Sequence, residues 1–304
     1  MHGGGHGHHH HHHHAAPGAG GDSRWLIGIA LNLVFVVVEA SAGLFGHSIA
    51  LLADAGHNLS DVLTLALSGA AAWIARWPPN PRRTYGFGKA TVLAALINAI
   101  LLVFACGFIA REALTRLSDP TPPATGLMIG VAAAGVVVNG LTAMLFTRGR
   151  DKDVNVRAAF LHMAADAAIS GGVVLAGLAI LTTGAAWVDP LTSLVILAVI
   201  LWGTWQVLRE AFDLAMDTAP PGVDMEALRI FLRACPGVLG VHDLHVWPLS
   251  TTETALTAHL VRPNGGDDLF LRSVCDGLHT RFGIRHATLQ VEGEGLAECE
   301  ELHD

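Results

Sequence analysis

Six apolar stretches, separated by short polar connections, dominate the first two thirds of this 304-residue chain. Each stretch is close to the roughly 20 residues that an α-helix needs to cross a bilayer. Hydrophobic residues make up 52% of the chain and charged residues only 14%, whereas an ordinary soluble domain has about 25% charged residues. We therefore expect an α-helical polytopic membrane protein with six transmembrane helices. The predicted helices are Trp25–Phe45, Ile49–Trp77, Thr91–Leu114, Ala124–Phe146, Arg157–Leu181 and Trp187–Leu208.

Lysine and arginine are distributed unevenly between the connections that link these helices. The connections after the second and fourth helices are basic, with Arg83 and Lys89 in the first and Arg157 at the end of the other. The short connections on the opposite side are not basic, and only Arg111 and Arg116 depart from the pattern. Because basic loops stay on the cytoplasmic side of a membrane, we expect both termini in the cytoplasm.

The sequence changes character after about Asp217, where charged residues become frequent. Amphipathic helical patterns alternate there with strand-like patterns, in the order helix, strand, strand, helix, strand. The segments are residues 224–238, 241–249, 253–263, 267–283 and 286–294. This order predicts a small α+β domain with its helices on one face of the sheet. We expect the membrane domain over residues 24–212 and the soluble domain over residues 213–304.

The first 23 residues are rich in histidine and glycine and contain no apolar signal-peptide core. Such a low-complexity segment is expected to be disordered. It is either an added tag or a native tail, and the glycines interleaved with His2 and His6 favour a native tail. A native tail would bind transition metals loosely through imidazole.

Cysteine spacing and charge argue against two other classes of site. The four cysteines are scattered without a CxxC pair, so neither a zinc ribbon nor a disulfide framework is expected. Cys106 is interpreted as a small apolar filler, whereas Cys299 near the C-terminus stays open as a soft metal ligand. The net charge is −8 and the basic residues form no stripe, so we expect no nucleic-acid partner.

Two apolar helices carry a repeated pattern of histidine and aspartate. His57 and Asp61 are four residues apart in the second predicted helix, and His162 and Asp166 repeat this spacing in the fifth. Residues four apart share one face of a helix. Two imidazoles and two carboxylates can therefore close a four-coordinate site, which suits tetrahedral zinc better than magnesium with its six oxygens. Asp54 lies on the same face, one turn before His57.

These polar residues also have possible roles that need no metal. A buried histidine can be an interhelical hydrogen-bond partner, and one His-Asp pair can be an imidazole–carboxylate couple without metal. Two such pairs in separate helices favour a metal. Asp54 has either a hydrated, proton-linked role at the entrance of the site or a packing role. Glu39, Asn98 and Asn139 are predicted to form hydrogen bonds between helices.

Three separated motifs occur in order along the chain: SIALLADAGHNLSDVLTLAL, RRTYGFGKATVLAALIN and VHDLHVWPLS. They resemble the cation diffusion facilitator family, in particular its bacterial zinc/cadmium/cobalt efflux branch and the related animal zinc transporters. The resemblance implies a homodimeric Zn²⁺/proton antiporter with six membrane helices and a cytoplasmic, metallochaperone-like domain. It places the transport site at His57, Asp61, His162 and Asp166, in a bacterial inner membrane.

The resemblance also implies two features outside the membrane site. Regulatory zinc is expected in the cytoplasmic domain, which also dimerises. Its predicted ligands are His242, His259, His286 and Glu292, with His245 as a further candidate. Lys89 is expected to pair with Asp217 across the dimer, at the hinge between the membrane and cytoplasmic parts.

Three function classes were compared. Histidine, with a reference pKa near 6.5, can exchange metal for protons at physiological pH, which favours a proton-coupled exporter of Zn²⁺, with Cd²⁺ or Co²⁺ as further cargo. A membrane-embedded zinc sensor without transport is the alternative, although no signalling domain follows the helices. An intramembrane metallohydrolase is disfavoured because the chain has no HExxH motif. We expect no enzymatic activity and no organic cofactor.

Overall fold

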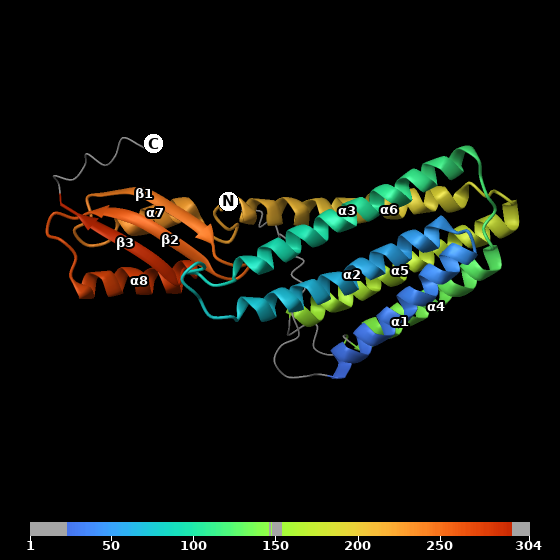
Figure 1. The fold of residues 1–304 in the computed structure, drawn as a ribbon, viewed down its shortest axis with the longest axis horizontal. Coiled ribbons are helices and arrows are strands. Elements are labelled where there is room, and N and C mark those ends of the chain that lie inside the picture. Colours follow the sequence, from blue (N-terminus) through green and yellow to red (C-terminus); the bar gives the residue numbers. More distant parts are fainter. Residues whose placement is uncertain (1–22, 146, 148–153, 294–304) are drawn as a thin grey trace, which may run out of the picture. The chain divides into compact units, whose positions relative to one another are not determined.

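A computed structural model describes residues 23–145, 147 and 154–293 of the chain (Figure 1). Its elements follow the predicted order of six long helices and then helix, strand, strand, helix, strand. Most of the predicted tail and Cys299 lie outside the described residues. The elements are α1 (Ser23–Phe45), α2 (Ile49–Ala75), α3 (Lys89–Ser118), α4 (Thr125–Leu145), α5 (Val154–Thr183), α6 (Val188–Ala215), α7 (Met225–Arg233), β1 (Gly240–Pro248), β2 (Thr254–Val261), α8 (Asp268–Phe282) and β3 (His286–Glu292).

Five of the described helices are long and apolar enough to cross a membrane, namely α2 to α6. In α1, the apolar stretch among the described side chains is the shorter Asn32–Phe45. Large apolar side chains such as Phe104, Phe108 and Trp202 point outward and are exposed. An outward-facing apolar surface of this size suits a hydrocarbon environment. These features confirm the predicted helical membrane fold.

The described residues form two compact units. The helical unit contains residues 23–69 and 98–205, and the sheet unit contains residues 70–97 and 206–293. The core of the helical unit receives side chains from all six long helices, many of them alanine. Small residues let helix backbones approach closely, which is the usual basis of helix packing in membranes.

Gly135 illustrates this close approach at the point where α4 meets α1 and α5. A Cβ atom at this position would lie 2.7 Å from the Phe35 ring and 2.9 Å from the Ser170 hydroxyl. Real Cβ atoms do not tolerate such contacts, so glycine allows the three helices to meet here. Ser170 is thereby held in the centre of the helical unit, where it is fully buried.

Asp189, in the first turn of α6, holds the beginning of α2 in place. Its carboxylate accepts hydrogen bonds from the Ser48 hydroxyl at 2.6 Å and from the backbone N–H groups of Ile49 at 2.7 Å and Ala50 at 3.3 Å. The first N–H groups of a helix have no partner within the helix. A buried carboxylate from another helix supplies that partner here, and thereby fixes where α2 starts.

The sheet unit contains a three-stranded sheet in the order β1-β2-β3. β1 pairs antiparallel with β2, and β2 pairs parallel with β3. Apolar side chains of β2, such as Leu256 and Leu260, pack against Leu232 of α7 and Leu278 of α8. Both helices therefore cover one sheet face, as predicted, and the other face carries the histidines.

A β-bulge in β1 brings two of these histidines to the same face. His242 is opposite His259, and His245 is opposite Thr257, so three steps along β1 match two steps along β2. In a regular strand, residues three apart point to opposite faces. The extra residue of the bulge, with Asp243 in the left-handed region at φ 50°, brings His242 and His245 to the same face.

Replacement of Asp189 by alanine is expected to lower the free energy of unfolding by about 2–4 kcal/mol, because two buried N–H groups lose their acceptor. A denaturant titration of the detergent-solubilised chain measures this. Thr192→Ala on the same helix is the matched control, because Thr192 only donates to the Val188 carbonyl one turn earlier. Equal stabilities of the two variants would contradict the assigned role of Asp189.

Candidate metal centres

The histidine and aspartate pairs of α2 and α5 meet inside the helical unit, where the two helices lie side by side (Figure 1). His57 Nε2 lies 3.4 Å from Asp166 Oδ1, and His162 Nε2 lies 3.3 Å from Asp61 Oδ2. Within α5, His162 Nε2 is also 3.7 Å from Asp166 Oδ2. Each imidazole thus reaches the carboxylate of the other helix. One ligand atom each from His57, Asp61 and Asp166 lies within 4.8 Å of the other two, and His162 adjoins this trio through its contacts with both aspartates.

The three nitrogen–oxygen separations just given are close to those around a tetrahedral metal ion. Ion-paired N–H···O hydrogen bonds are usually about 2.7–2.9 Å long, which is shorter than these three separations. Ligand atoms around a tetrahedral zinc ion with bonds of 2.0–2.1 Å lie about 3.3 Å from one another. Asp166 is fully buried, and neither of its oxygens accepts a hydrogen bond from the described residues. An ionised carboxylate in this position is costly unless a cation compensates its charge, and a metal ion at this cluster would do so.

Asp54 lies beside this cluster and contacts other partners. Its Oδ2 accepts a hydrogen bond from the Ser170 hydroxyl at 2.9 Å, and its side chain is also hydrogen bonded to Glu39. Glu39 in turn accepts a hydrogen bond from the Asn58 amide at 3.1 Å. Asp54 thus contacts these polar neighbours. These contacts are compatible with both the entrance role and the packing role, and a functional measurement distinguishes the two.

The predicted interhelical hydrogen bonds are present for two of the three residues. Glu39 of α1 receives its bond from Asn58 of α2, and Asn98 of α3 donates to the Thr64 hydroxyl of α2 at 2.6 Å. Asn139 of α4 is buried, and its amide has no hydrogen-bond partner within the described part of the chain. The prediction therefore fails for Asn139.

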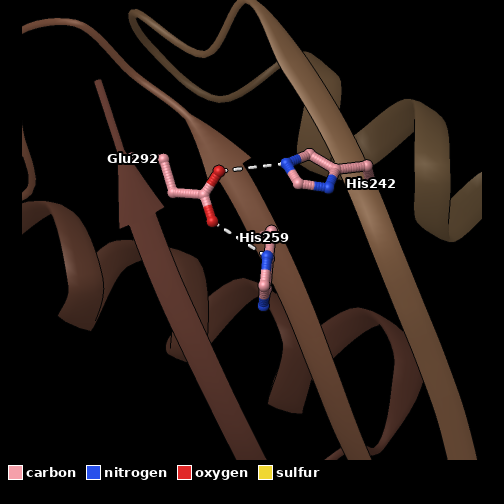
Figure 2. Close-up of side chains that lie close together, drawn as sticks. All are labelled: His242, His259 and Glu292. Atoms are coloured by element: carbon pink, nitrogen blue, oxygen red, sulfur yellow. Dashed lines mark hydrogen bonds and ion pairs between the residues drawn. The ribbon is translucent and has the colours of Figure 1, made fainter. Parts of the chain in front are cut away.

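A second cluster lies on the open face of the sheet and contains His242, His259 and Glu292 (Figure 2). His242 and His259 are register partners on β1 and β2, and Glu292 of β3 pairs with Val261, two residues after His259. The register therefore places all three side chains on the same face. His242 Nε2 lies 3.1 Å from Glu292 Oε2, and His259 Nδ1 lies 2.9 Å from Glu292 Oε1.

The donor atoms of this second cluster also fit a transition metal. One ligand atom from each residue lies within 4.8 Å of the other two. His259 Nδ1 makes no aligned hydrogen bond despite its short distance to Glu292. Glu292 is only 2% exposed, and the Gln290 amide donates to its Oε1 at 2.7 Å, which orients the carboxylate. Two imidazoles and a carboxylate leave one position of a tetrahedral site open.

Two further predicted ligands, His245 and His286, lie apart from this trio. His286 is six residues before Glu292 on β3, about 20 Å along the strand, and its ring packs edge-on against Tyr85. The structure thus does not bring His286 to the trio within one chain. His245 lies 2.8 Å from Asp243, whose other oxygen is 3.5 Å from His259. Asp243 could not be predicted from strand alternation, because the bulge turns it toward the histidines.

The described cysteines show no sign of metal ligation. Cys106 is buried in the helical core, as predicted for a filler, and Cys275 is exposed. Cys235 donates to the Phe231 carbonyl, and burial raises the pKa of its thiol. A thiol held in the protonated form is a poor metal ligand.

Lys89 and Asp217 lie close together in the sheet unit. Lys89 Nζ is 2.5 Å from Asp217 Oδ1 and donates a second hydrogen bond to the Leu214 carbonyl at 3.1 Å. The pair joins the first residue of α3 to the segment after α6. Both groups belong to one chain, whereas the family resemblance implied a pair across two subunits.

Comparison with known families decides what kind of protein carries these two clusters. The model of the cation efflux transmembrane domain matches residues 25–214, and the model of the cation efflux protein cytoplasmic domain matches residues 220–294. The chain belongs to the cation efflux family. It is an integral membrane transporter rather than an enzyme. The resemblance stated from the three sequence motifs is thereby confirmed.

Relatives of this cation efflux protein cover most of its length. The metal cation efflux system protein CzcD of Cupriavidus metallidurans is 34% identical over 93% of this chain and 89% of its own length. The zinc transporter ZitB of Escherichia coli is 36% identical over 88% of this chain and 87% of its own. The cadmium, cobalt and zinc/H⁺-K⁺ antiporter of Bacillus subtilis is 32% identical over 88% of both chains.

Glu292→Gln is expected to weaken Co²⁺ binding to the sheet cluster by about 10–100-fold, because the amide keeps the shape but not the anionic ligand. The titration uses the full chain carrying Asp61→Asn and Asp166→Asn, which removes both carboxylates of the helical cluster. The visible absorption of bound Co²⁺ reports occupancy. His279→Ala, on exposed α8 surface, is the control. An unchanged affinity in Glu292→Gln would exclude this trio as a metal centre.

Proposed function

We propose that this protein exports Zn²⁺, and also Cd²⁺ and Co²⁺, from the cytoplasm in exchange for protons. It does so by alternating access around His57, Asp61, His162 and Asp166. The observation that carries the proposal is the cross-helix pairing of both imidazoles with carboxylates at separations close to the edges of a tetrahedral zinc site. The names of the relatives, a zinc transporter and an antiporter for cadmium, cobalt and zinc, support the same cargo.

Charge balance explains how one site can carry metal in one direction and protons in the other. Asp61 and Asp166 together contribute two negative charges. One Zn²⁺ with two neutral imidazoles neutralises them, and so do two protonated imidazoles without metal. Metal must displace protons from imidazole nitrogen in order to bind. Lower pH on the outer side therefore favours protonated His57 and His162, and this releases the metal.

The arrangement of the ligands supports alternating access. Two of the three close contacts join α2 to α5, and the third lies within α5. A small displacement of one helix along the other changes the cross-helix separations without breaking any covalent or backbone bond. The site can therefore release its ion, which a structural zinc site held by a single rigid element does not do.

The sheet cluster, the Lys89–Asp217 pair and the membrane location fit the same transport function. His242, His259 and Glu292 bind regulatory Zn²⁺ in the cytoplasmic domain, which pairs two copies into a homodimer. Lys89 and Asp217 form an ion pair that joins the start of α3 to the segment after α6. The protein resides in a bacterial inner membrane with both termini in the cytoplasm, as the distribution of basic residues indicates.

The test is zinc flux in proteoliposomes under an imposed pH gradient, comparing the parent chain with Asp61→Ala and Asp166→Ala. We expect the parent flux to follow the gradient. Each variant should lose flux by about 100-fold or more, since an ion-ligating carboxylate contributes several kcal/mol in a dry site. Ser193→Ala, a buried hydroxyl of α6 outside the cluster, is the control and should transport normally.

Zinc binding without flux under any gradient would contradict the proposal and favour the alternative function, a membrane-embedded zinc sensor. Flux that persists in both aspartate variants would instead place the transport site elsewhere. Flux that ignores the pH gradient would remove the proton from the mechanism and leave the cargo assignment intact.

A further inference from the structure

Two carboxyl groups that ligate nothing in the metal clusters lie in contact inside the helical unit. Glu39 of α1 and Asp54 of α2 are both fully buried, and their side chains are hydrogen bonded to each other. Their described partners include no lysine or arginine. Isolated ionised carboxylates are costly in an apolar interior, so a buried pair of this kind requires a specific explanation.

In each carboxyl group of this acid pair, one oxygen accepts a hydrogen bond from a neighbouring side chain. Glu39 Oε2 accepts from the Asn58 amide at 3.1 Å, and Asp54 Oδ2 accepts from the Ser170 hydroxyl at 2.9 Å. Glu39 Oε1 and Asp54 Oδ1 receive no donor from any other described residue. A carboxylate can only accept, so a hydrogen bond between two carboxyl groups requires a proton on one of them. One proton shared between Glu39 and Asp54 would supply the missing donor.

The acid pair lies nearer than the metal cluster to the end of the bundle where α1 joins α2. Glu39 is six residues before the end of α1, and Asp54 is five residues after the start of α2. Along α2, Asp54 lies about 4.5 Å before His57 and about 10 Å before Asp61. The titratable groups that face the acid pair are His57 on α2 and Asp166 on α5, while Ser170 of α5 and the neighbouring Gly135 of α4 are uncharged.

The two polar neighbours of the acid pair also affect its ionisation. Asn58 and Ser170 donate to carboxyl oxygens, and such donors stabilise the ionised form of an acid. If the two acids stayed neutral and only joined their helices, the Asn58 and Ser170 donors would stabilise them less than they stabilise a carboxylate. The surroundings of Glu39 and Asp54 thus support loss of the shared proton as well as its retention.

We propose that Glu39 and Asp54 are a second proton carrier of the transport cycle, separate from the metal ligands. The acid pair holds one proton while the metal site is empty and releases it when a divalent cation occupies the site one helical turn away. This inference rests on the proposed function. In balanced form, metal ion plus protonated pair gives bound metal, ionised pair and one free proton.

The coupling acts equally in both directions. A doubly charged cation at His57 and Asp166 stabilises two ionised carboxylates nearby, and protonation of the acid pair weakens metal binding by the same factor. Because the acid pair lies toward the α1–α2 end, which the basic loops assign to the outer side, a proton from outside reaches it before it reaches His57. Proton entry there promotes release of the metal outward.

The experiment replaces Glu39 by Gln, and separately Asp54 by Asn, in the full chain. These amides keep the shape and hydrogen-bonding capacity of the acid pair but cannot release a proton. Zinc should still bind to the four-residue site, with the weaker affinity expected when the acid pair is permanently neutral. Zinc flux driven by a pH gradient should fall by about tenfold or more, with fewer protons moved per zinc ion. Ser193→Ala is the control for disturbing a buried polar group of the bundle.

Unchanged flux and an unchanged proton-to-zinc ratio in both variants would overturn the acid-pair proposal while leaving the proposed function intact. Loss of zinc binding together with flux would also overturn it, since the residues would then only support the metal site. Absence of flux in the parent chain would instead contradict the proposed function itself.

Infrared difference spectroscopy of the solubilised protein gives a second readout that does not depend on transport. The carbonyl band of a protonated carboxylic acid should disappear from the parent when zinc is added. Both variants should lack this zinc-dependent change. Release of a proton from the acid pair would be contradicted if zinc left the parent band unaltered. It would also be contradicted if zinc changed the band in both variants as much as in the parent.

Discussion

A carboxylate inside a hydrocarbon environment needs a compensating partner, and this constraint organises the helical unit. Asp189 is compensated by the hydroxyl and backbone N–H groups at the start of α2. Asp166 and Asp61 face the imidazoles of His57 and His162. Glu39 and Asp54 lie in contact, and in our proposal a shared proton compensates both. A helix terminus, a candidate metal site and a proposed proton site are thus three solutions to one physical problem.

These solutions are connected through α2. Asp189 fixes the residue at which α2 begins, and the helical period then determines which side chains face α5. Asp54, His57 and Asp61 follow one another along that face at intervals of three and four residues. A shift of one residue at the start of the helix would rotate all three away from their partners. The fold therefore positions the proton site and the metal site with a single element.

The two metal clusters differ in how far apart their ligands lie. In the helical unit the nitrogen–oxygen separations are 3.3–3.7 Å, whereas in the sheet unit they are 2.9 and 3.1 Å. In the sheet unit, Glu292 lies between the two imidazoles and holds the trio together.

Sequence patterns were sufficient for features that depend on local periodicity. The six helices, the order of the α+β domain and the shared face of His57 with Asp61 all follow from spacing. Contacts set by tertiary structure could not be predicted in this way. Some of these contacts join segments that are distant in sequence, such as the Asp189 cap and the pairing of Glu39 with Asp54. Others depend on strand geometry, such as the bulge that turns Asp243 toward His259 and the distance of His286 from Glu292. No local pattern encodes such contacts.

The central claim is that one divalent ion binds between α2 and α5 on two imidazoles and two carboxylates. X-ray absorption at the zinc edge measures this directly in a chain whose N-terminal tail histidines are replaced by glycine and whose sheet site is removed by His259→Ala and Glu292→Ala. We expect one zinc ion per chain, with two nitrogen and two oxygen ligands at about 2.0–2.2 Å. A shell of six oxygens, sulfur ligation, or a spectrum unchanged by additional His57→Ala and His162→Ala substitutions would contradict it.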